Sequence, residues 1–479
     1  MPDLNSPVRV RIAPSPTGFA HLGTASTALY NVLFARQRGG TFVLRVDDTD
    51  MERNRPEYEL LIYESLRWLG LDWDEGPDKG GPDAPYRQSE RLDLYKQHAV
   101  RLLNEGKAYK CWCTREELDA ERKQAQAEKR AYKYSRRCLT NPPGGRTEFT
   151  IRFKIPGGEV SFTDMIRGDM RFDAELMGDF IIVKSDGYPT YQFASPVDDA
   201  VMKITHVIRG EEHLSNTPYQ LMLVDALGYA RPFAFAHMPL ILAADGSKLS
   251  KRKHPEANLA LYREQGYVPE ALLNYLALLG WNPGTAQEIF SFDDLLRAFS
   301  FERVQHAGAR FDWEKLNWIN GEYIRGFDDT ELARRLQPFL PELDQGTICR
   351  AVPSLRTRLP KLAAARDYLE YLWTDPEPPS LGADATERIR AAVSVLRDVT
   401  WEPDPIETAL ERAVEASGVG KGKFYTPLRD ALTGRKVSLP IHYTLALLPK
   451  ELALSRLSRA ADLPTPAPRD LPASGEVTR

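Results

Sequence analysis

Residues 8–24 read VRVRIAPSPTGFAHLGT and encode a strand followed by a loop. From Val8 to Ile12, apolar residues alternate with arginines, as they do in a β-strand. Prolines and a glycine then stop the strand and shape a rigid loop. Residues 24–38 place apolar side chains at helical spacing, and residues 41–46 read as a second strand. Strand, loop, helix and strand make a βαβ unit, so we expect a parallel sheet.

The composition is that of a large folded protein with balanced charge. The 479 residues are 42% hydrophobic, and 63 Lys+Arg face 67 Asp+Glu. This excludes disorder and a tail-driven nucleic-acid binder, although a basic groove on an acidic body stays allowed. No apolar run approaches the ~18–20 residues of a membrane span, and the N-terminus does not resemble a signal peptide. We expect a soluble, cytoplasmic protein.

The rest of the chain alternates between two kinds of pattern. Residues 109–184 interrupt the α/β pattern with a cysteine cluster, a charged helix and short strands. The α/β pattern then resumes, with expected strands at 190–194 and 204–208. After about residue 269 almost everything has helical periodicity, including 359–373. We therefore expect an inserted segment within the α/β part and an all-helical C-terminal region.

The loop over residues 14–24 lies where an open α/β sheet binds ligands, between a strand end and a helix start. The N–H groups and dipole of a helix N-terminus favour phosphate. His21 could donate a ring N–H to a phosphate oxygen, and Gly23 would let a base approach the backbone. The alternative is that Ser15 or Thr17 merely caps the helix and His21 is incidental.

A second segment, AADGSKLSKRK at 243–253, follows an apolar strand. Its four cations in a glycine-containing loop suit a mobile clamp for a triphosphate, since lysine is a compact charge on a flexible stem. A solvated loop is the alternative. Walker-type and G-x-G-x-x-G motifs are absent, which disfavours P-loop and dinucleotide-binding proteins.

Together these segments resemble the two signatures of class I aminoacyl-tRNA synthetases. PSPTG (14–18) followed by HLGT (21–24) resembles their HIGH motif, and KLSKR (248–252) resembles their KMSKS loop. The form RIAPSPTG is typical of the glutamyl and glutaminyl branch, and the helical C-terminal third resembles bacterial glutamyl-tRNA synthetases. Three more segments resemble that branch: VDDTD (46–50), SDGYPTY (185–191) and VIRGEE (207–212).

The resemblance implies an α/β Rossmann-like catalytic domain with an α+β insertion, followed by an all-α anticodon-binding region. The expected parts are 1–108 and 188–260 for the two catalytic halves, 109–187 for an acceptor-binding insertion, 261–320 for a stem-contact helical domain and 321–479 for the anticodon-binding region. It also implies ATP-dependent ligation of L-glutamate to tRNA(Glu) through a glutamyl-adenylate, ending on the 2′-hydroxyl of the terminal adenosine. We expect a monomer.

The resemblance assigns roles to individual residues. His21 and Lys251 would act on the ATP phosphates and the departing pyrophosphate, with Mg²⁺ carried by ATP. The expected ATP-binding residues are Ser15, Thr17, Gly18, His21, Gly23, Lys248, Lys251 and Arg252. The expected glutamate-binding residues are Arg11, Ser15, Asp47, Tyr191, Ser195 and Arg209. Asp47 stands where glutamate is usual in the family, and Ser195 where a longer residue is common.

The cysteines form a separate candidate site. Three of the four cysteines crowd into Cys111, Cys113 and Cys138, which favours metal ligation over a disulfide framework. With Tyr134 they resemble the zinc motif that some family members carry in the insertion. A histidine common after the third cysteine is replaced by Thr140, so the fourth ligand would be Tyr134 or water. The alternative is a set of buried, metal-free thiols.

Two arginines are candidates for reading the tRNA. By family alignment Arg358 falls where discriminating enzymes place an arginine against the third anticodon base, and Arg429 resembles another anticodon-side position. An ordinary solvated arginine is the alternative for Arg358. The alternatives for the whole chain are a relaxed enzyme that also forms Glu-tRNA(Gln), and a catalytically silent tRNA-binding module. The intact His21 and Lys251 argue against the silent module.

Overall fold

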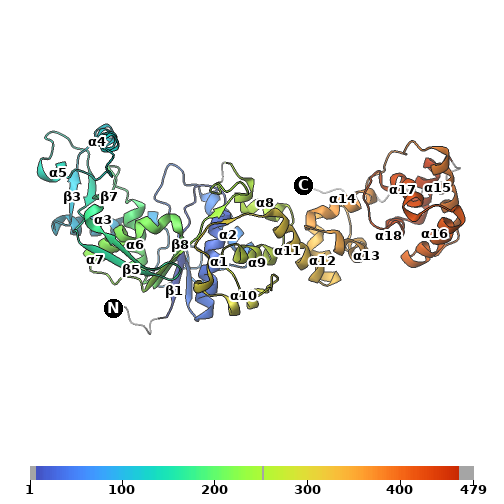
Figure 1. Ribbon diagram of the computed structural model, residues 1–479, viewed down its shortest axis with the longest axis horizontal. Coiled ribbons are helices and arrows are strands. Elements are labelled where there is room, and N and C mark those ends of the chain that lie inside the picture. Colours follow the sequence, from blue (N-terminus) through green and yellow to red (C-terminus); the bar gives the residue numbers. More distant parts are fainter. Residues whose placement is uncertain (1–6, 251–252, 463–479) are drawn as a thin grey trace. The chain divides into compact units, whose positions relative to one another are not determined.

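The computed structural model describes residues 7–250 and 253–462. The chain forms two compact units, Met1–Leu261 with Leu272–Trp313 and Tyr262–Ala271 with Glu314–Arg479. Figure 1 follows the chain from the blue and green α/β part to the orange and red helical part. The expected fold class is confirmed. The finer division into five parts stays a prediction.

The βαβ unit forms as expected at the start of the first unit. Strand β1 (Arg9–Ile12) pairs in parallel with β2 (Thr41–Leu44), and α1 (Leu22–Gln37) connects them. On the other side of β1, the Arg9 carbonyl accepts a hydrogen bond from the Thr205 amide at 2.9 Å, which places β8 (His206–Gly210) beside it. The β1 and β8 carboxyl ends are therefore neighbours.

Strand β8 belongs to a four-stranded sheet of order β6-β5-β9-β8. Its members pair in parallel, except β5 and β6, which form an antiparallel hairpin that the sequence patterns did not predict. The bounds are β5 Glu159–Asp164, β6 Gly168–Asp173 and β9 Ala234–Met238. The remaining helices of this α/β part are α2 Pro56–Trp68, α3 Leu92–Asn104, α6 Tyr191–Val201 and α7 Thr217–Ala226.

The strand expected at residues 190–194 is not formed, because Thr190 is the extended N-cap of α6 and the chain then turns helical. Every residue from Phe193 to Asp199 is buried. Over only five residues an apolar helix start cannot be distinguished from a short buried strand by pattern.

The insertion is a small antiparallel sheet of order β3-β4-β7 with two helices. Helix α4 begins with a capping box: the Glu117 carboxylate accepts from the Thr114 amide at 2.8 Å, and the Thr114 hydroxyl accepts from the Glu117 amide at 3.3 Å. The bounds are β3 Ala108–Cys111, α4 Arg115–Ala127, α5 Arg137–Thr140, β4 Thr150–Phe153 and β7 Phe180–Val183.

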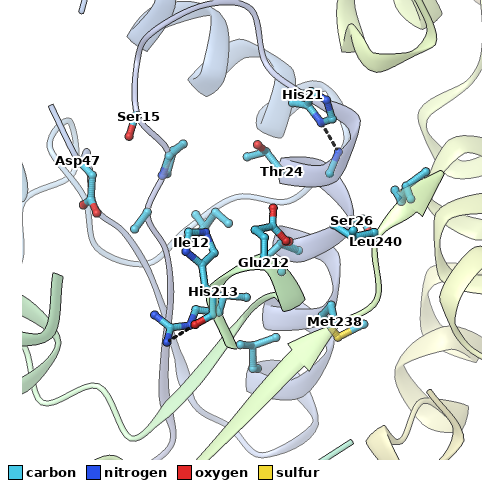
Figure 2. A pocket seen from close by; sticks show the side chains of 18 of the residues that line it. Ile12, Ser15, His21, Thr24, Ser26, Asp47, Glu212, His213, Met238 and Leu240 are labelled. Atoms are coloured by element: carbon cyan, nitrogen blue, oxygen red, sulfur yellow. Dashed lines mark hydrogen bonds between the residues drawn. The ribbon is translucent and has the colours of Figure 1, made fainter. Parts of the chain in front are cut away.

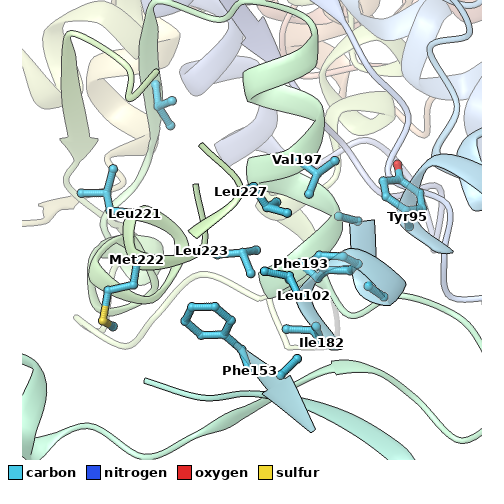
Figure 3. Close-up of a cluster of buried hydrophobic side chains, with 14 of the residues drawn as sticks. Tyr95, Leu102, Phe153, Ile182, Phe193, Val197, Leu221, Met222, Leu223 and Leu227 are labelled. Carbon is cyan, nitrogen blue, oxygen red and sulfur yellow. The ribbon is translucent and has the colours of Figure 1, made fainter. Parts of the chain in front are cut away.

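A continuous apolar core joins the insertion sheet to the α/β part. Figure 3 shows Phe153 and Ile182 from this sheet close to Phe193 of α6 and Leu102 of α3. All four side chains are buried. Because α6 is fixed by this core, the polar side chains on its other face have defined positions.

The later part of the chain is helical, as expected. Two short strands, β10 (Ile241–Leu242) and β11 (Ala309–Arg310), pair in parallel. The helices are α8 Leu259–Glu264, α9 Pro269–Gly280, α10 Phe292–Ala298, α11 Trp313–Gly326, α12 Asp329–Leu336, α13 Gln345–Leu355, α14 Ala365–Leu369, α15 Ala383–Leu396, α16 Pro403–Ser417, α17 Lys421–Thr433, α18 Ile441–Ala446 and α19 Lys450–Ala460.

The helix expected over residues 359–373 is instead broken into α14 and two short 3₁₀ turns. Pro360 lies at its start, and proline excludes a regular helix over the residue before it. Among the helices of residues 7–250 and 253–462, none is both long and apolar enough to cross a membrane.

Candidate active site

A cavity of about 440 Å³ lies at the carboxyl ends of β1 and β8. Its position is the one that open α/β sheets use for ligands. The expected site residues that line it are Arg11, Ser15, His21, Gly23, Asp47, Tyr191, Ser195, Arg209 and Lys248. Figure 2 shows Ser15 and Asp47 on one side of it and His21 and Thr24 across from them. Segments far apart in sequence thus meet at one cavity.

Some expected residues are not part of this lining. Thr17 and Gly18 belong to the loop after β1 but are absent from the cavity wall. Lys251 and Arg252 lie outside the described residues. The segment that follows them is close to His21, because the Ala20 carbonyl accepts from the Leu259 amide at 3.1 Å. The two signature segments are therefore neighbours in the fold.

His21 is the N-cap of α1, and this defines its tautomer. Its Nδ1 accepts a hydrogen bond from the Gly23 amide at 2.9 Å, so a neutral ring carries its proton on Nε2. A Cβ atom at Gly23 would lie 3.1 Å from this Nδ1. Neither Ser15 nor Thr17 caps the helix. His21 is both a structural cap and a wall residue of the cavity.

Arg11 does not present an open guanidinium fork to the cavity. Its Nε and Nη2 donate to the two carboxylate oxygens of Asp199 at 3.0 and 3.1 Å, and its Nη1 donates to the Ile208 carbonyl at 3.4 Å. Three of the five N–H donors of the guanidinium are thus engaged, which leaves two for a ligand. Arg11 and Asp199 are both buried.

Arg209 donates hydrogen bonds from all three of its guanidinium nitrogens. Its Nε donates to His237 at 3.2 Å, and Nη2 donates to the Thr217 hydroxyl at 2.7 Å. Its Nη1 donates to the Gln220 carbonyl oxygen at 2.8 Å and to the Tyr191 hydroxyl at 3.2 Å. Because the Tyr191 oxygen accepts from Arg209, its own O–H is oriented away and can donate to a ligand.

Arg45 joins the two positions that differ from the family pattern. Its Nε and Nη2 donate to the oxygens of Asp47 at 2.7 and 3.3 Å, and Nη2 also donates to the Ser195 hydroxyl at 3.1 Å. Nη1 donates to Asp199 at 2.6 Å. Arg45 is fully buried, so these contacts fix the positions of Asp47 and Ser195 from behind the cavity wall.

The charges at the cavity have perturbed pKa values. Burial raises the pKa of Asp47 to about 6, against the opposing charge of Arg45. Burial acts the same way on Asp199, but the charges of Arg11 and Arg45 outweigh it and hold its pKa at about 2. Burial, followed by the charge of Arg209, lowers the pKa of His213 to about 3. At neutral pH His213 is therefore an uncharged wall residue.

Three residues behind this wall are not among those expected from the sequence. They are Arg45, Asp199 and His237. Each contacts the site through a side chain that is distant in sequence, so no local pattern contains these contacts. The adjacent acids Asp198 and Asp199 within an apolar stretch were a usable signal, because buried carboxylates need charged partners. No local pattern points to Arg45 as that partner.

The cysteine cluster forms within the insertion. The Cys111, Cys113 and Cys138 sulfurs all lie within 4.8 Å of one another. The Tyr134 hydroxyl is 3.4 Å from the Cys111 sulfur and 3.2 Å from the Cys113 sulfur. Arg137 donates to the Cys113 sulfur at 3.1 Å. Tyr134 is thus beside the three thiols, and Thr140 is exposed to solvent.

The two anticodon candidates differ in their surroundings. Arg358 is exposed at the end of a 3₁₀ turn, and no side-chain partner contacts it among the described residues. Arg429 of α17 is half-buried and donates to the Ser438 hydroxyl at 3.1 Å. Arg356, in contrast, is paired with Asp329. Arg358 is therefore the more available cation.

Several known proteins similar to this chain are named glutamate–tRNA ligases. The class I tRNA synthetase (E and Q) catalytic domain matches residues 7–318, and an anticodon binding domain matches residues 331–461. The glutamate–tRNA ligase of Moorella thermoacetica is 44% identical, over 95% of this chain and 98% of its own. That of Acidothermus cellulolyticus is 45% identical, over 95% of each.

Solved structures agree. The crystal structure of a glutamate tRNA ligase from Elizabethkingia meningosepticum, in complex with its amino acid, matches with a TM-score of 0.84 and 34% identity. The match covers 95% of this chain and 99% of that one. By sequence, by both domains and by fold, this chain belongs to the glutamate–tRNA ligases of class I.

Proposed function

We propose that the cavity at the ends of β1 and β8 binds glutamate and ATP and forms the glutamyl-adenylate. The observation that carries this proposal is the meeting of two buried arginines, Arg11 and Arg209, with His21 around one cavity. Class I synthetases use ATP as its Mg²⁺ complex. The ligation of glutamate then needs alignment and charge neutralisation rather than a side-chain nucleophile.

The side-chain carboxylate of glutamate is held by Arg11 and Tyr191. Two N–H donors of Arg11 are not engaged within the protein, and the Tyr191 O–H is directed by Arg209. If glutamine bound instead, its side-chain NH2 group would face one of these donors and could not accept a hydrogen bond from it. For a buried charged pair this costs about 2–5 kcal/mol, which is enough discrimination without an editing domain.

The rest of the substrate follows from this placement. Asp47 accepts the ammonium group, and Ser15 and Ser195 border it on the cavity wall. The ionised α-carboxylate attacks the α-phosphorus of ATP, and pyrophosphate leaves. The 2′-hydroxyl of the terminal adenosine of tRNA then attacks the glutamyl carbonyl carbon, the acyl–phosphate bond breaks, and AMP and the hydroxyl proton are released. His21 donates a hydrogen bond from Nε2 to a phosphate of ATP. Gly23 and the loop that contains Thr17 and Gly18 lie along the nucleotide. The departing pyrophosphate is held by three cations, Lys248, Lys251 and Arg252.

Zinc in the insertion is also proposed. A zinc ion with bonds of about 2.0 Å to oxygen and 2.3 Å to sulfur separates its oxygen and sulfur ligands by roughly 3.5 Å. The Tyr134 oxygen lies 3.2 and 3.4 Å from two of the sulfurs, close to that spacing. Cys111, Cys113, Cys138 and Tyr134 would hold the ion, which would supply structural closure of the insertion and no chemistry at the cavity.

We further propose that the enzyme discriminates tRNA(Glu) from tRNA(Gln) through Arg358 and Arg429 and acts as a cytoplasmic monomer. Arg358 supports this assignment, because it is exposed in the matched anticodon-binding region and has no ion-pair partner within residues 7–250 and 253–462. The test is charging of purified tRNA(Glu) and tRNA(Gln), each offered labelled glutamate or glutamine. Glutamate on tRNA(Glu) alone is the expected result. Glutamate on both tRNAs would refute the discrimination.

Single substitutions test the assigned phosphate contacts. We expect Lys251→Ala to abolish adenylate formation, measured by tRNA-dependent pyrophosphate exchange, and to leave tRNA affinity nearly unchanged. Lys248→Ala should weaken the same exchange less. Lys96→Ala, on the exposed face of α3, is the matched control. Full exchange by the Lys251→Ala variant would refute its role.

A further inference from the structure

A second cavity, also of about 440 Å³, lies at the opposite ends of the same strands. Strand β1 contributes Arg11 to the first cavity and Arg9 to the second, and β8 contributes Arg209 to the first and Val207 to the second. Helices α6 and α7 and the turn 229–233 complete its wall. The proposed functions of the first cavity leave this one without a ligand.

The wall is chiefly apolar, with cations at three places. Its apolar side chains include Pro196, Ile204, Leu221, Val224, Phe233 and Phe235. The cations are Arg9, Lys203 and Arg231. All three are paired with carboxylates, but Lys203 is the loosest: it is 75% exposed, and its one ion pair among the described residues is a 3.4 Å contact with Asp83, which Arg9 already holds at 2.9 Å. A ligand with an apolar body and one negative charge fits this combination.

The only carboxylate among the described lining residues is Asp199. It is neutralised from the other side by Arg11 and Arg45 at 3.0 and 2.6 Å. The wall therefore carries no unpaired negative charge that would repel an anion. A cationic or strongly polar ligand would lose its hydration in the apolar part of the wall, where no polar group replaces the water.

Two residues connect this cavity to the first one. Asp199 lines the second cavity and its oxygens hold Arg11, a wall residue of the first. Gln220 also lines the second cavity, and its Oε1 accepts from Arg209 at 2.8 Å. The Gln220 Nε2 is buried and has no hydrogen-bond partner among the described residues. Because this nitrogen has almost no accessible surface, a ligand in the cavity reaches it only if the Gln220 side chain moves.

We propose that this second cavity is a binding site for a small amphiphilic anion, an aromatic or branched apolar body with a single carboxylate or sulfonate. Its occupation shifts Asp199 and Gln220 and so changes the affinity of the first cavity for glutamate. The coupling is reciprocal, because each ligand must change the affinity for the other by the same factor. The coupling rests on the roles proposed for Arg11 and Arg209, whereas the binding does not.

The binding is tested with 8-anilinonaphthalene-1-sulfonate, whose fluorescence rises in apolar sites. We expect saturable binding of one molecule per full-length chain, unaffected by saturating ATP. Ala200→Trp fills the cavity from α6 and should weaken binding at least tenfold, as should Val224→Phe from α7. Ala120→Trp, on the exposed face of α4, is the control and should bind as the unchanged chain does. Unchanged melting temperatures establish that the variants fold.

Competition defines the chemistry of the ligand. 1-Naphthoate should displace the probe, and neutral 1-naphthamide should do so at least tenfold more weakly. Equal displacement by the amide would overturn the requirement for an anion. Displacement of the probe by ATP, or undiminished binding to both filled variants, would place the probe elsewhere and overturn the site. Binding that appears only after deletion of residues 1–6 would assign the cavity to the chain's own N-terminal segment instead.

The coupling is measured separately. Saturating 1-naphthoate should change the KM for glutamate at least threefold in the unchanged enzyme and not in Ala200→Trp, and glutamate should change the Kd of 1-naphthoate in the same direction. An unchanged KM beside normal probe binding would overturn the coupling alone. Failure of glutamate charging with normal probe binding would instead contradict the proposed roles of the first cavity.

Discussion

Arg209 donates its Nε–H to Nε2 of His237 across 3.2 Å. The other ring nitrogen of His237 lies 2.6 Å from the Asp164 carboxylate, so a neutral ring donates from Nδ1 and accepts at Nε2. Burial lowers the pKa of His237, which favours this neutral form. His237 thus acts as a positioning residue that orients Arg209 toward the cavity.

Substituting His237 should weaken glutamate binding more than turnover. His237→Ala leaves the buried Nε–H of Arg209 without its acceptor, at about 1–3 kcal/mol, or roughly 5- to 150-fold in the KM for glutamate. His237→Gln offers Arg209 an oxygen acceptor and should recover part of the loss. Steady-state charging kinetics separate KM from kcat, and His442→Ala in the second unit is the control. An unchanged KM with a reduced kcat would contradict the positioning role.

The pH dependence of glutamate use should follow Asp47. Its pKa is raised to about 6 by burial, so the carboxylate is charged above that pH and neutral below it. A neutral Asp47 cannot pair with the ammonium group, and kcat/KM for glutamate should fall about tenfold per unit as the pH drops below 6. Asp47→Asn should be less active at pH 7.5 and have a flat profile. A flat profile in the unchanged enzyme would refute this role.

The insertion should hold one zinc ion per chain, measured by elemental analysis of the purified protein. Cys138→Ser should lose the metal and lower the melting temperature, because a structural zinc site stabilises the fold around it. Tyr134→Phe should keep the thiolates but bind zinc at least tenfold more weakly. Cys349→Ser, in α13, should have full zinc content. Equal zinc in Cys138→Ser and in the unchanged chain would exclude the site.

Arg358 should affect tRNA selection without affecting the cavity. Arg358→Ala removes an exposed, unpaired cation and should lower kcat/KM for tRNA(Glu) about 5- to 150-fold, which corresponds to roughly 1–3 kcal/mol for a base contact. The KM for glutamate should stay the same. Arg350→Ala, another exposed arginine of the same unit, should change neither value. Equal losses in the two variants would reduce Arg358 to a general phosphate contact.

The residues that line the cavity could be predicted from the sequence better than the buried residues that hold them in place. Arg11 and His21 belong to local motifs in which chemistry and spacing coincide, so a pattern could find them. Arg45 and Asp199 have roles that depend on a contact between residues 154 positions apart, which no local pattern contains. The strand wrongly expected at 190–194 hid this contact, because the chain there begins helix α6, which carries Ser195 and Asp199 one turn apart on one face.

The same contact has a consequence for synthesis on the ribosome. Arg45 emerges 150 residues before Ser195 and 154 residues before Asp199, and until then only its near neighbour Asp47 can pair with it. A fully buried guanidinium with so few partners is strongly unfavourable. The nascent βαβ unit should therefore stay open until α6 has left the exit tunnel. A translation product that ends before α6 should be a target for chaperones and proteases rather than a folded half-domain.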